Sequence, residues 1–149
     1  MNHRYHPLKL AAVDQEDLNI FAACLQDAVV PIAGLNYDKT NGQFHLIANR
    51  FCWECYHDDN PNDDDNHPHQ RVTAGLHIDH VKSVKKKGFD ETHPDGFMNL
   101  LTIHNPRKGC INLIFSGGGE IEIKIDKMKC LLSDLDNPYP TSQKPGHPR

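Results

Sequence analysis

The sequence predicts an α+β fold in which antiparallel strands predominate. One amphipathic helical stripe lies near the N-terminus, and several short segments after it alternate apolar and polar residues. A period of two is typical of strands that bury one face against a core. Helices and strands do not alternate along the chain, so a parallel sheet is not expected. We therefore expect a bent sheet of about seven strands, with a helix at each end of the chain.

The N-terminal helix is the clearest predicted element. Asp14 is a good N-cap residue, because its carboxylate can accept a hydrogen bond from the first turn. The apolar residues that follow recur at helical spacing: Leu18, Phe21, Ala22 and Leu25. This spacing places them on one stripe, so the helix should pack against the sheet.

Strand patterns fill the chain from residue 28 to residue 126. The predicted strands span residues 28–37, 43–53, 72–78, 81–87, 97–104, 111–115 and 121–125. Residues 38–42 end in Asn-Gly, the strongest short signal of a hairpin turn. The alternation slips near Asp79 and His80, where we expect a bulge or corner.

The last apolar group predicts a short C-terminal helix. Its members are spaced as on one helical face: Met128, Leu131, Leu132 and Leu135. Residues 1–136 would then form a single domain with a loop inserted at about residues 57–70, and residues 137–149 a proline-rich tail. Seven short strands followed by a helix resemble the pleckstrin-homology-like barrel, in which the last helix plugs one open end. That resemblance concerns the fold alone.

Composition and charge exclude some classes of protein. The 149 residues include 16 basic and 20 acidic side chains, and the net charge of −4 argues against a nucleic-acid partner. No apolar run approaches the ~20 residues that span a bilayer, so membrane insertion is not expected. The polar N-terminus does not resemble a secretory signal. Five cysteines, an odd number, fit a reducing compartment, and we expect a cytoplasmic protein.

Cys52-x-x-Cys55, followed by His57, is the motif of the chain whose side chains are best suited to bind a metal. Two thiolates and an imidazole are common zinc ligands. However, no second close pair of the usual kind follows, and on a strand the two cysteines would point to opposite faces. The preferred interpretation is a strand end with two free thiols and no cofactor. The alternative is a metal-binding or small-ligand-binding protein, with or without catalysis, that uses these cysteines and nearby histidines.

No established catalytic motif is present. The chain lacks the Gly-x-Ser-x-Gly nucleophile elbow, the His-Glu-x-x-His zinc motif and the glycine-rich dinucleotide fingerprint. We therefore assign no catalytic residues, and a non-enzymatic role is favoured.

Seven short motifs, in order along the chain, resemble a family of small alphaproteobacterial proteins known as a domain of unknown function. They are Leu8-Lys9-Leu10-Ala11-Ala12, Leu25-Gln26-Asp27-Ala28, Asn49-Arg50-Phe51-x-Trp53-Glu54, Gly75-Leu76-His77, Phe115-x-Gly117-Gly118-Gly119, Leu132-x-Asp134-Leu135 and Pro145-x-His147. The resemblance implies a bacterial cytosolic protein and brings no activity, cofactor or partner. In the family pattern, positions 52 and 55 are not cysteine, which argues against a metal site there.

Five residues of these motifs are the candidate binding residues: Gln26, Asp27, Arg50, Trp53 and Glu54. In a structural interpretation, Asp27 and Arg50 form a buried ion pair and Trp53 covers the core. In a functional interpretation, the same residues form a recognition patch with Trp53 as its anchor, because Trp and Arg dominate binding hot spots. We expect a binding or scaffold module for a protein partner or a small ligand, and the oligomeric state is not predicted.

Overall fold

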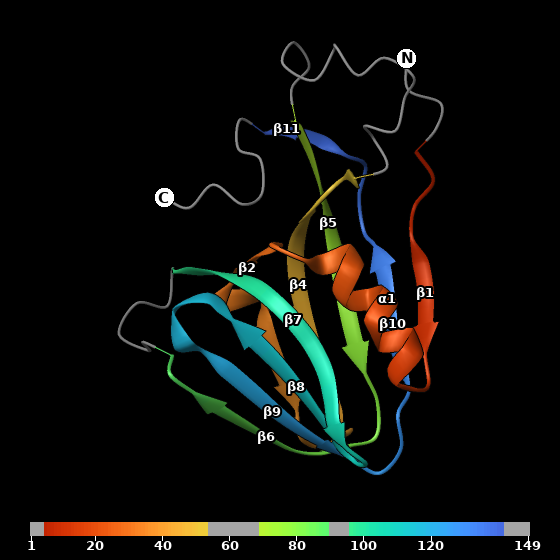
Figure 1. The fold of residues 1–149 in the computed structure, drawn as a ribbon, viewed down its shortest axis with the longest axis vertical. Coiled ribbons are helices and arrows are strands. Elements are labelled where there is room, and N and C mark those ends of the chain that lie inside the picture. Colours follow the sequence, from red (N-terminus) through yellow and green to blue (C-terminus); the bar gives the residue numbers. More distant parts are fainter. Residues whose placement is uncertain (1–4, 54–68, 90–95, 142–149) are drawn as a thin grey trace.

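The structure, a computed structural model, describes residues 5–53, 69–89 and 96–141 (Figure 1). Within these ranges the chain forms an 11-stranded sheet and one α-helix, α1 (Gln15–Leu25). The strands are β1 (Lys9–Ala12), β2 (Val29–Pro31), β3 (Leu35–Asp38), β4 (Gln43–Phe51), β5 (His69–Ile78), β6 (Val81–Lys87), β7 (Phe97–Arg107), β8 (Cys110–Phe115), β9 (Glu120–Ile125), β10 (Cys130–Asp134) and β11 (Tyr139–Thr141). The prediction of a mainly antiparallel fold with an N-terminal helix is confirmed.

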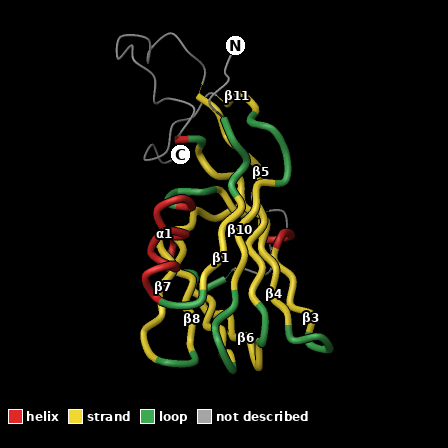
Figure 2. The backbone as a smooth tube through the Cα atoms, turned by 90° about the vertical axis from the view of Figure 1, so that its right-hand side faces the viewer, coloured by secondary structure: helices red, strands yellow, loops and turns green. Residues whose placement is uncertain are grey.

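The sheet is bent into two layers that face each other across the core. Its strands pair in the order β1-β10-β5-β4-β2-β7-β8-β9-β6, with β3 added beside β4 and β11 beside β5. Val29 in the short strand β2 pairs with both β4 and β7, and so joins the two layers. Figure 2 shows β4, β5 and β10 on one side of the molecule, and β7, β8 and α1 on the other. The path is open and ends at β1 and β6, so the pleckstrin-homology-like barrel stays a prediction.

Helix α1 begins and packs as its sequence predicts. The Asp14 carboxylate accepts a hydrogen bond of 2.9 Å from the backbone N–H of Asp17. Leu18, Phe21 and Leu25 are buried, and the helix packs chiefly against β7 and β1. It therefore lies between β1 and β7 (Figure 1). No helix in the described ranges has the length and apolar character needed to cross a membrane.

The core between the layers follows the period-two alternation of the strands. In β4, Phe44, Leu46 and Ala48 are buried, whereas the residues between them are half-buried on the outer face. In β9, Ile121, Ile123 and Ile125 alternate with polar residues in the same way. The strand positions that carry polar side chains on the outer face of β4 and β5 thus follow directly from the sequence.

The predicted C-terminal helix is wrong, because residues 130–134 form strand β10. Cys130 and Leu132 are buried and Leu131 between them is exposed, which is the alternation of a strand. β10 pairs on one side with β1 and on the other with β5. Two neighbours offer its backbone more hydrogen bonds than an isolated turn of helix would have, so tertiary pairing overrides the helical spacing.

The expected number of strands is too low, because short strands were not recognised. β1 and β11 pair at the margins of the sheet, and the predicted strand 28–37 is divided into β2 and β3 by a 3₁₀ turn at Ile32–Gly34. The corner near Asp79 and His80 is confirmed: His80 has a φ of 59° between β5 and β6. Most of the loop predicted at about residues 57–70 lies outside the described residues, and residues 69 and 70 belong to β5.

Replacing Phe21 by alanine tests how far the sheet depends on α1. Phe21 is 1% exposed and belongs to the core cluster, whereas its neighbour Ile20 is 54% exposed. We expect Phe21→Ala to lower the free energy of unfolding by about 3–5 kcal/mol, because it removes apolar contacts and leaves a cavity. Ile20→Ala, the matched control on the same helix, should cost less than about 1 kcal/mol. Urea unfolding measures both, and equal losses would contradict the packing described here.

Candidate functional site

The outer face of β4, β5 and β10 carries two rows of side chains that the strand register brings together. In the first row, His45 of β4 lies opposite His77 of β5, and His77 lies opposite Leu131 of β10. In the second row, Gly75 of β5 is opposite Ile47 on one side and Ser133 on the other. These residues point away from the core because their neighbours along each strand are buried in it.

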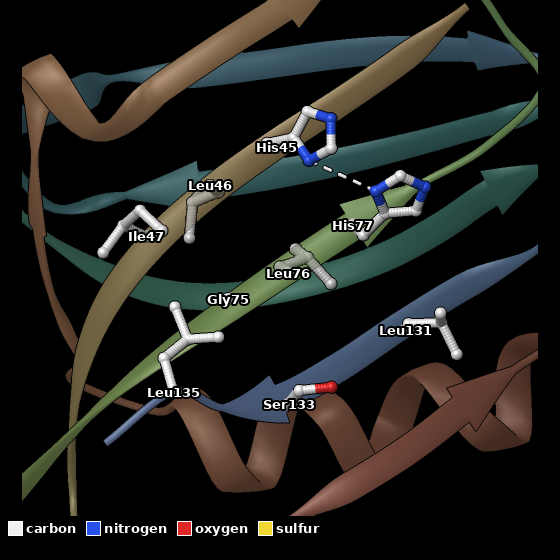
Figure 3. A pocket seen from close by; sticks show the side chains of 9 residues that line it. All are labelled: His45, Leu46, Ile47, Gly75, Leu76, His77, Leu131, Ser133 and Leu135. Atoms are coloured by element: carbon white, nitrogen blue, oxygen red, sulfur yellow. Dashed lines mark hydrogen bonds between the residues drawn. The ribbon is translucent and has the colours of Figure 1, made fainter.

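A groove with a volume of about 340 Å³ lies over these rows (Figure 3). Its lining residues are His45, Leu46, Ile47, Gly75, Leu76, His77, Leu131, Ser133 and Leu135. Gly75 opens the floor, because a Cβ atom there would lie 3.3 Å from Cδ1 of Leu135. Leu135 is held over that floor by a 2.8 Å hydrogen bond from its backbone N–H to the carbonyl oxygen of Thr73. The volume is near the lower end of the range typical of small-molecule sites.

A chain of hydrogen bonds forms the polar end of the groove. Nε2 of His77 is 2.8 Å from Oδ1 of Asp79, and Nδ1 of His77 is 3.2 Å from Nδ1 of His45. Gln43 also donates to Oδ1 of Asp79, at 3.3 Å. Figure 3 shows the two imidazole rings turned toward each other at one end of the groove.

The tautomers of the two histidines follow from this chain when both are neutral. An ionised Asp79 can only accept, so Nε2 of His77 carries the hydrogen and Nδ1 of His77 is an acceptor. Nδ1 of His45 must then donate to it, which leaves Nε2 of His45 as an acceptor. Within the pair, His45 is therefore the donor and His77 the acceptor.

Asp79 stays ionised at neutral pH. Burial raises its pKa, but the hydrogen bond and charge of His77, the charge of Lys129 and the hydrogen bond from Gln43 outweigh burial. The pKa of Asp79 therefore lies below its ordinary value. The side chains of His77 and Asp79 are 25% and 20% exposed, so the pair is accessible from solvent.

Arg50, a predicted binding residue, is buried in an ion pair with Asp134. Its Nε and Nη2 atoms donate to the two carboxylate oxygens of Asp134 at 2.9 and 2.8 Å, and both side chains are at most 1% exposed. The backbone N–H of Leu8 and the hydroxyl of Tyr5 donate to the same carboxylate. The expected ion pair between Arg50 and Asp27 is therefore wrong, because the structure gives Arg50 a different partner.

Gln26, Asp27 and Trp53 lie nearer the surface. Gln26 is the exposed C-cap residue of α1, and Asp27 follows it with a φ of 63° and a 2.9 Å hydrogen bond to the carbonyl oxygen of Leu100. Trp53 is 43% exposed and packs edge-to-face on Phe51, with ring centroids 4.4 Å apart. These residues are not among those that line the groove. Glu54 lies outside the described residues.

The cysteine motif is only partly described. Cys52 is buried and disulfide-bonded, so the expected free thiol at this position is wrong, and in this state its sulfur is not a thiolate ligand. Cys55 and His57 lie outside the described residues. Among those described, no group of three or more His, Cys, Asp or Glu side chains is arranged to hold a metal ion. Burial raises the pKa of Cys130, a free thiol, to about 12.

The sequence did not single out His45 or Asp79 as site residues. His45 is an ordinary polar residue in an alternating strand, and it meets His77 only because β4 and β5 pair in one register. The separation of 32 residues hides that meeting. The His77-x-Asp79 spacing was the one local signal, since residues two apart on a strand share a face.

The fold and its surface define a β-rich protein with a groove on the outer face of its sheet. The chain belongs to the family described as "Protein of unknown function (DUF2948)", whose family model matches residues 8–147. The resemblance of the sequence to a family of unknown function is thereby confirmed. Comparisons with curated proteins and with solved structures gave no match.

Replacing Asp134 by asparagine should destabilise the fold strongly. The change removes the charge of the carboxylate that accepts two hydrogen bonds from the buried guanidinium group of Arg50, and we expect a loss of about 3–5 kcal/mol. The matched control is Glu122→Gln, which breaks the ion pair to Arg107, whose side chain is 59% exposed, and should cost much less, because exposed ion pairs contribute little to stability. Urea unfolding compares them, and similar losses would contradict the role given to Asp134.

The same ion pair predicts how stability depends on pH. Burial raises the pKa of Asp134, but the hydrogen bonds from Arg50, Leu8 and Tyr5, together with the charge of Arg50, bring it below its ordinary value. A carboxyl group with a lowered folded-state pKa contributes stability above its unfolded pKa, and that contribution is lost as the pH falls through the folded value. We therefore expect the free energy of unfolding to fall below about pH 4.

The control is the double variant Arg50→Met with Asp134→Leu, which removes both charges and keeps apolar volume. Its free energy of unfolding should fall less steeply than that of the wild type as the pH is lowered, because it lacks this carboxyl group. Urea midpoints measured at several pH values give both curves. Parallel curves would mean that another carboxyl group causes the acid sensitivity.

Proposed function

We propose that the chain is a non-enzymatic binding module of the bacterial cytoplasm, and that the groove on the outer face of β4, β5 and β10 is its ligand site. The observation that carries the proposal is a groove with an apolar rim that ends at two coupled imidazoles. Small-molecule sites typically combine apolar walls with a few fixed polar groups.

The apolar side of the groove supports a small ligand. Leu131 and Leu135 are 40% and 56% exposed, and both line the same groove beside the bare backbone of Gly75. Apolar surface of this kind is stabilised when a ligand removes it from water. At about 340 Å³, the groove accommodates a small molecule.

The polar end of the groove supports binding in one defined orientation. His77 is fixed by Asp79, and Asp79 is held in turn by Gln43, so the imidazole orientation is set before a ligand arrives. A preorganised hydrogen-bonding group loses little entropy on binding. This fixed chain gives the groove a defined polar end and a defined apolar end.

A neutral fluorescent probe, N-phenyl-1-naphthylamine, tests the proposal. We expect saturable fluorescence enhancement with the wild-type protein and an affinity about tenfold lower for Gly75→Val, because the added side chain occupies the floor against Leu135. Circular dichroism confirms that the variant is folded.

Two exposed leucines provide a matched pair of controls. Leu135→Ala should weaken probe binding, because it removes part of the groove wall, whereas Leu101→Ala should leave binding unchanged. Leu101 is 47% exposed on β7 and does not line the groove. Equal affinities for the wild type, Gly75→Val and Leu135→Ala would overturn the proposed site.

A further inference from the structure

We propose that His45 and His77 form a site for a zinc ion, which binds between the Nδ1 atoms of the two imidazoles on the outer face of β4 and β5. The inference goes beyond the proposed function, because a metal ion can bind to this pair whether or not the groove takes an organic ligand. Three features carry it: the distance between the two nitrogens, the carboxylate behind His77, and the charge around the pair.

Strands β4 and β5 hold the two histidines in fixed positions. The strands pair without a register shift from Phe44 to Phe51, and His45 lies directly opposite His77. Opposite residues of antiparallel strands have Cβ atoms about 4.5–5.5 Å apart, so their side chains can reach one common ion. Ligands on paired strands are also placed more precisely than ligands on a loop.

The spacing of the ring nitrogens is close to that of two zinc ligands. Nδ1 of His45 is 3.2 Å from Nδ1 of His77, whereas the ring centroids are 4.5 Å apart, so these nitrogens lie on the facing sides of the rings (Figure 3). Two imidazole nitrogens that lie about 2.0–2.1 Å from a tetrahedral zinc ion are about 3.3–3.4 Å from each other. A small opening of the contact therefore admits the ion.

Asp79 prepares His77 as a metal ligand. Its carboxylate accepts from Nε2 of His77 at 2.8 Å, so the hydrogen of the neutral ring lies on Nε2 and Nδ1 keeps its lone pair. Gln43 donates to the same carboxylate. Metal-binding histidines almost always donate their second ring N–H to a carboxylate, a carbonyl or water, which orients the ring and raises its basicity. His77 thus has the arrangement of a ligand before an ion arrives.

His45 becomes the second ligand when its hydrogen moves from one ring nitrogen to the other. Without a metal, Nδ1 of His45 donates to Nδ1 of His77. When zinc accepts the lone pairs of both Nδ1 atoms, the hydrogen of His45 lies on Nε2 and both rings remain neutral. One hydrogen bond between the rings is then replaced by two Zn–N bonds, with no net release of a proton.

The charge around the pair favours a cation. Asp79 stays ionised beside His77, and Asp38 interacts electrostatically with His45. Lys129 interacts with Asp79 and offsets one of these two negative charges. The remaining negative charge attracts a divalent cation. Imidazole nitrogen suits zinc, copper and nickel, whereas magnesium and calcium prefer oxygen ligands.

The proposed site has two protein ligands and is accessible from solvent. Within the described parts of the chain, no third histidine, cysteine or carboxylate joins the pair to complete a metal-binding group. His77 is 25% exposed, and both histidines line the groove. Zinc sites with fewer than four protein ligands leave positions for water or a bound molecule. We therefore expect weaker binding than at a structural zinc site with four protein ligands.

Zinc chloride is the probe, and the sample is the full chain without an affinity tag, stripped of metal by a chelator. Titration calorimetry should show zinc binding that is at least about tenfold weaker in His45→Gln and in His77→Gln. Circular dichroism checks that both variants are folded. The matched control is His104→Gln, at a half-buried position on β7 outside the groove, which should bind zinc like the wild type. Equal zinc affinities for all four proteins would overturn the inference.

Asp79→Asn tests the carboxylate behind His77. The amide keeps an oxygen acceptor but removes the charge, so zinc affinity should fall about tenfold while binding of N-phenyl-1-naphthylamine is unchanged. The matched control is Asp126→Asn, whose side chain is 69% exposed in an ion pair with Lys82, and it should bind zinc like the wild type. Equal zinc affinities in the two variants would overturn the positioning role of Asp79.

Two further comparisons separate this site from the cysteine motif and from the proposed function. Zinc binding that is lost in Cys55→Ser but kept in His45→Gln would overturn the inference in favour of the cysteine motif. If zinc binds through the histidines and the naphthylamine probe does not bind, the inference stands and the proposed function fails. If the probe binds and zinc does not, the groove remains a binding site and the inference is overturned.

Discussion

The buried ion pair between Arg50 and Asp134 is the constraint on which the arrangement of this sheet depends. Arg50 belongs to β4 and Asp134 to β10, and β5 lies between these two strands. The guanidinium group reaches across β5 and forms two hydrogen bonds to the carboxylate, which also accepts from Tyr5 and Leu8. One carboxylate therefore fixes β4, β10 and the segment before β1 relative to one another, at a site closed to water.

The groove lies on the reverse side of the same three strands. Because side chains alternate between faces, Asp134 points inward while Ser133 and Leu135, its neighbours, belong to the groove. The ion pair thus sets the lateral position of β10 from the inside, and that position decides which residues of β10 stand beside Gly75 and His77 outside. Stability and the candidate site are linked through backbone register, although no side chain of the ion pair lines the groove.

Local patterns were enough to predict elements whose structure is decided within a few residues. The capped helix α1, the alternating strands and the corner at His80 depend on neighbours in sequence. Strand β10 was misread because its leucines also satisfy helical spacing, and only the pairing with β1 and β5 decides between the two. The candidate site was missed for the same reason: His45 meets His77 across 32 residues, and no motif encodes that distance.

The ion pair also selects one register of strand β10, which offsets the free energy that its desolvation costs. A slip of one residue in the pairing of β10 would move every side chain of that strand to the opposite face. Leu132 would then face the solvent, and Asp134 would no longer accept the two hydrogen bonds from buried Arg50, at a cost of about 3–5 kcal/mol. An apolar pair would penalise the slip less, since an apolar side chain tolerates many neighbours. The ion pair therefore selects one register, and with it one arrangement of His77, Gly75 and Ser133 on the outer face.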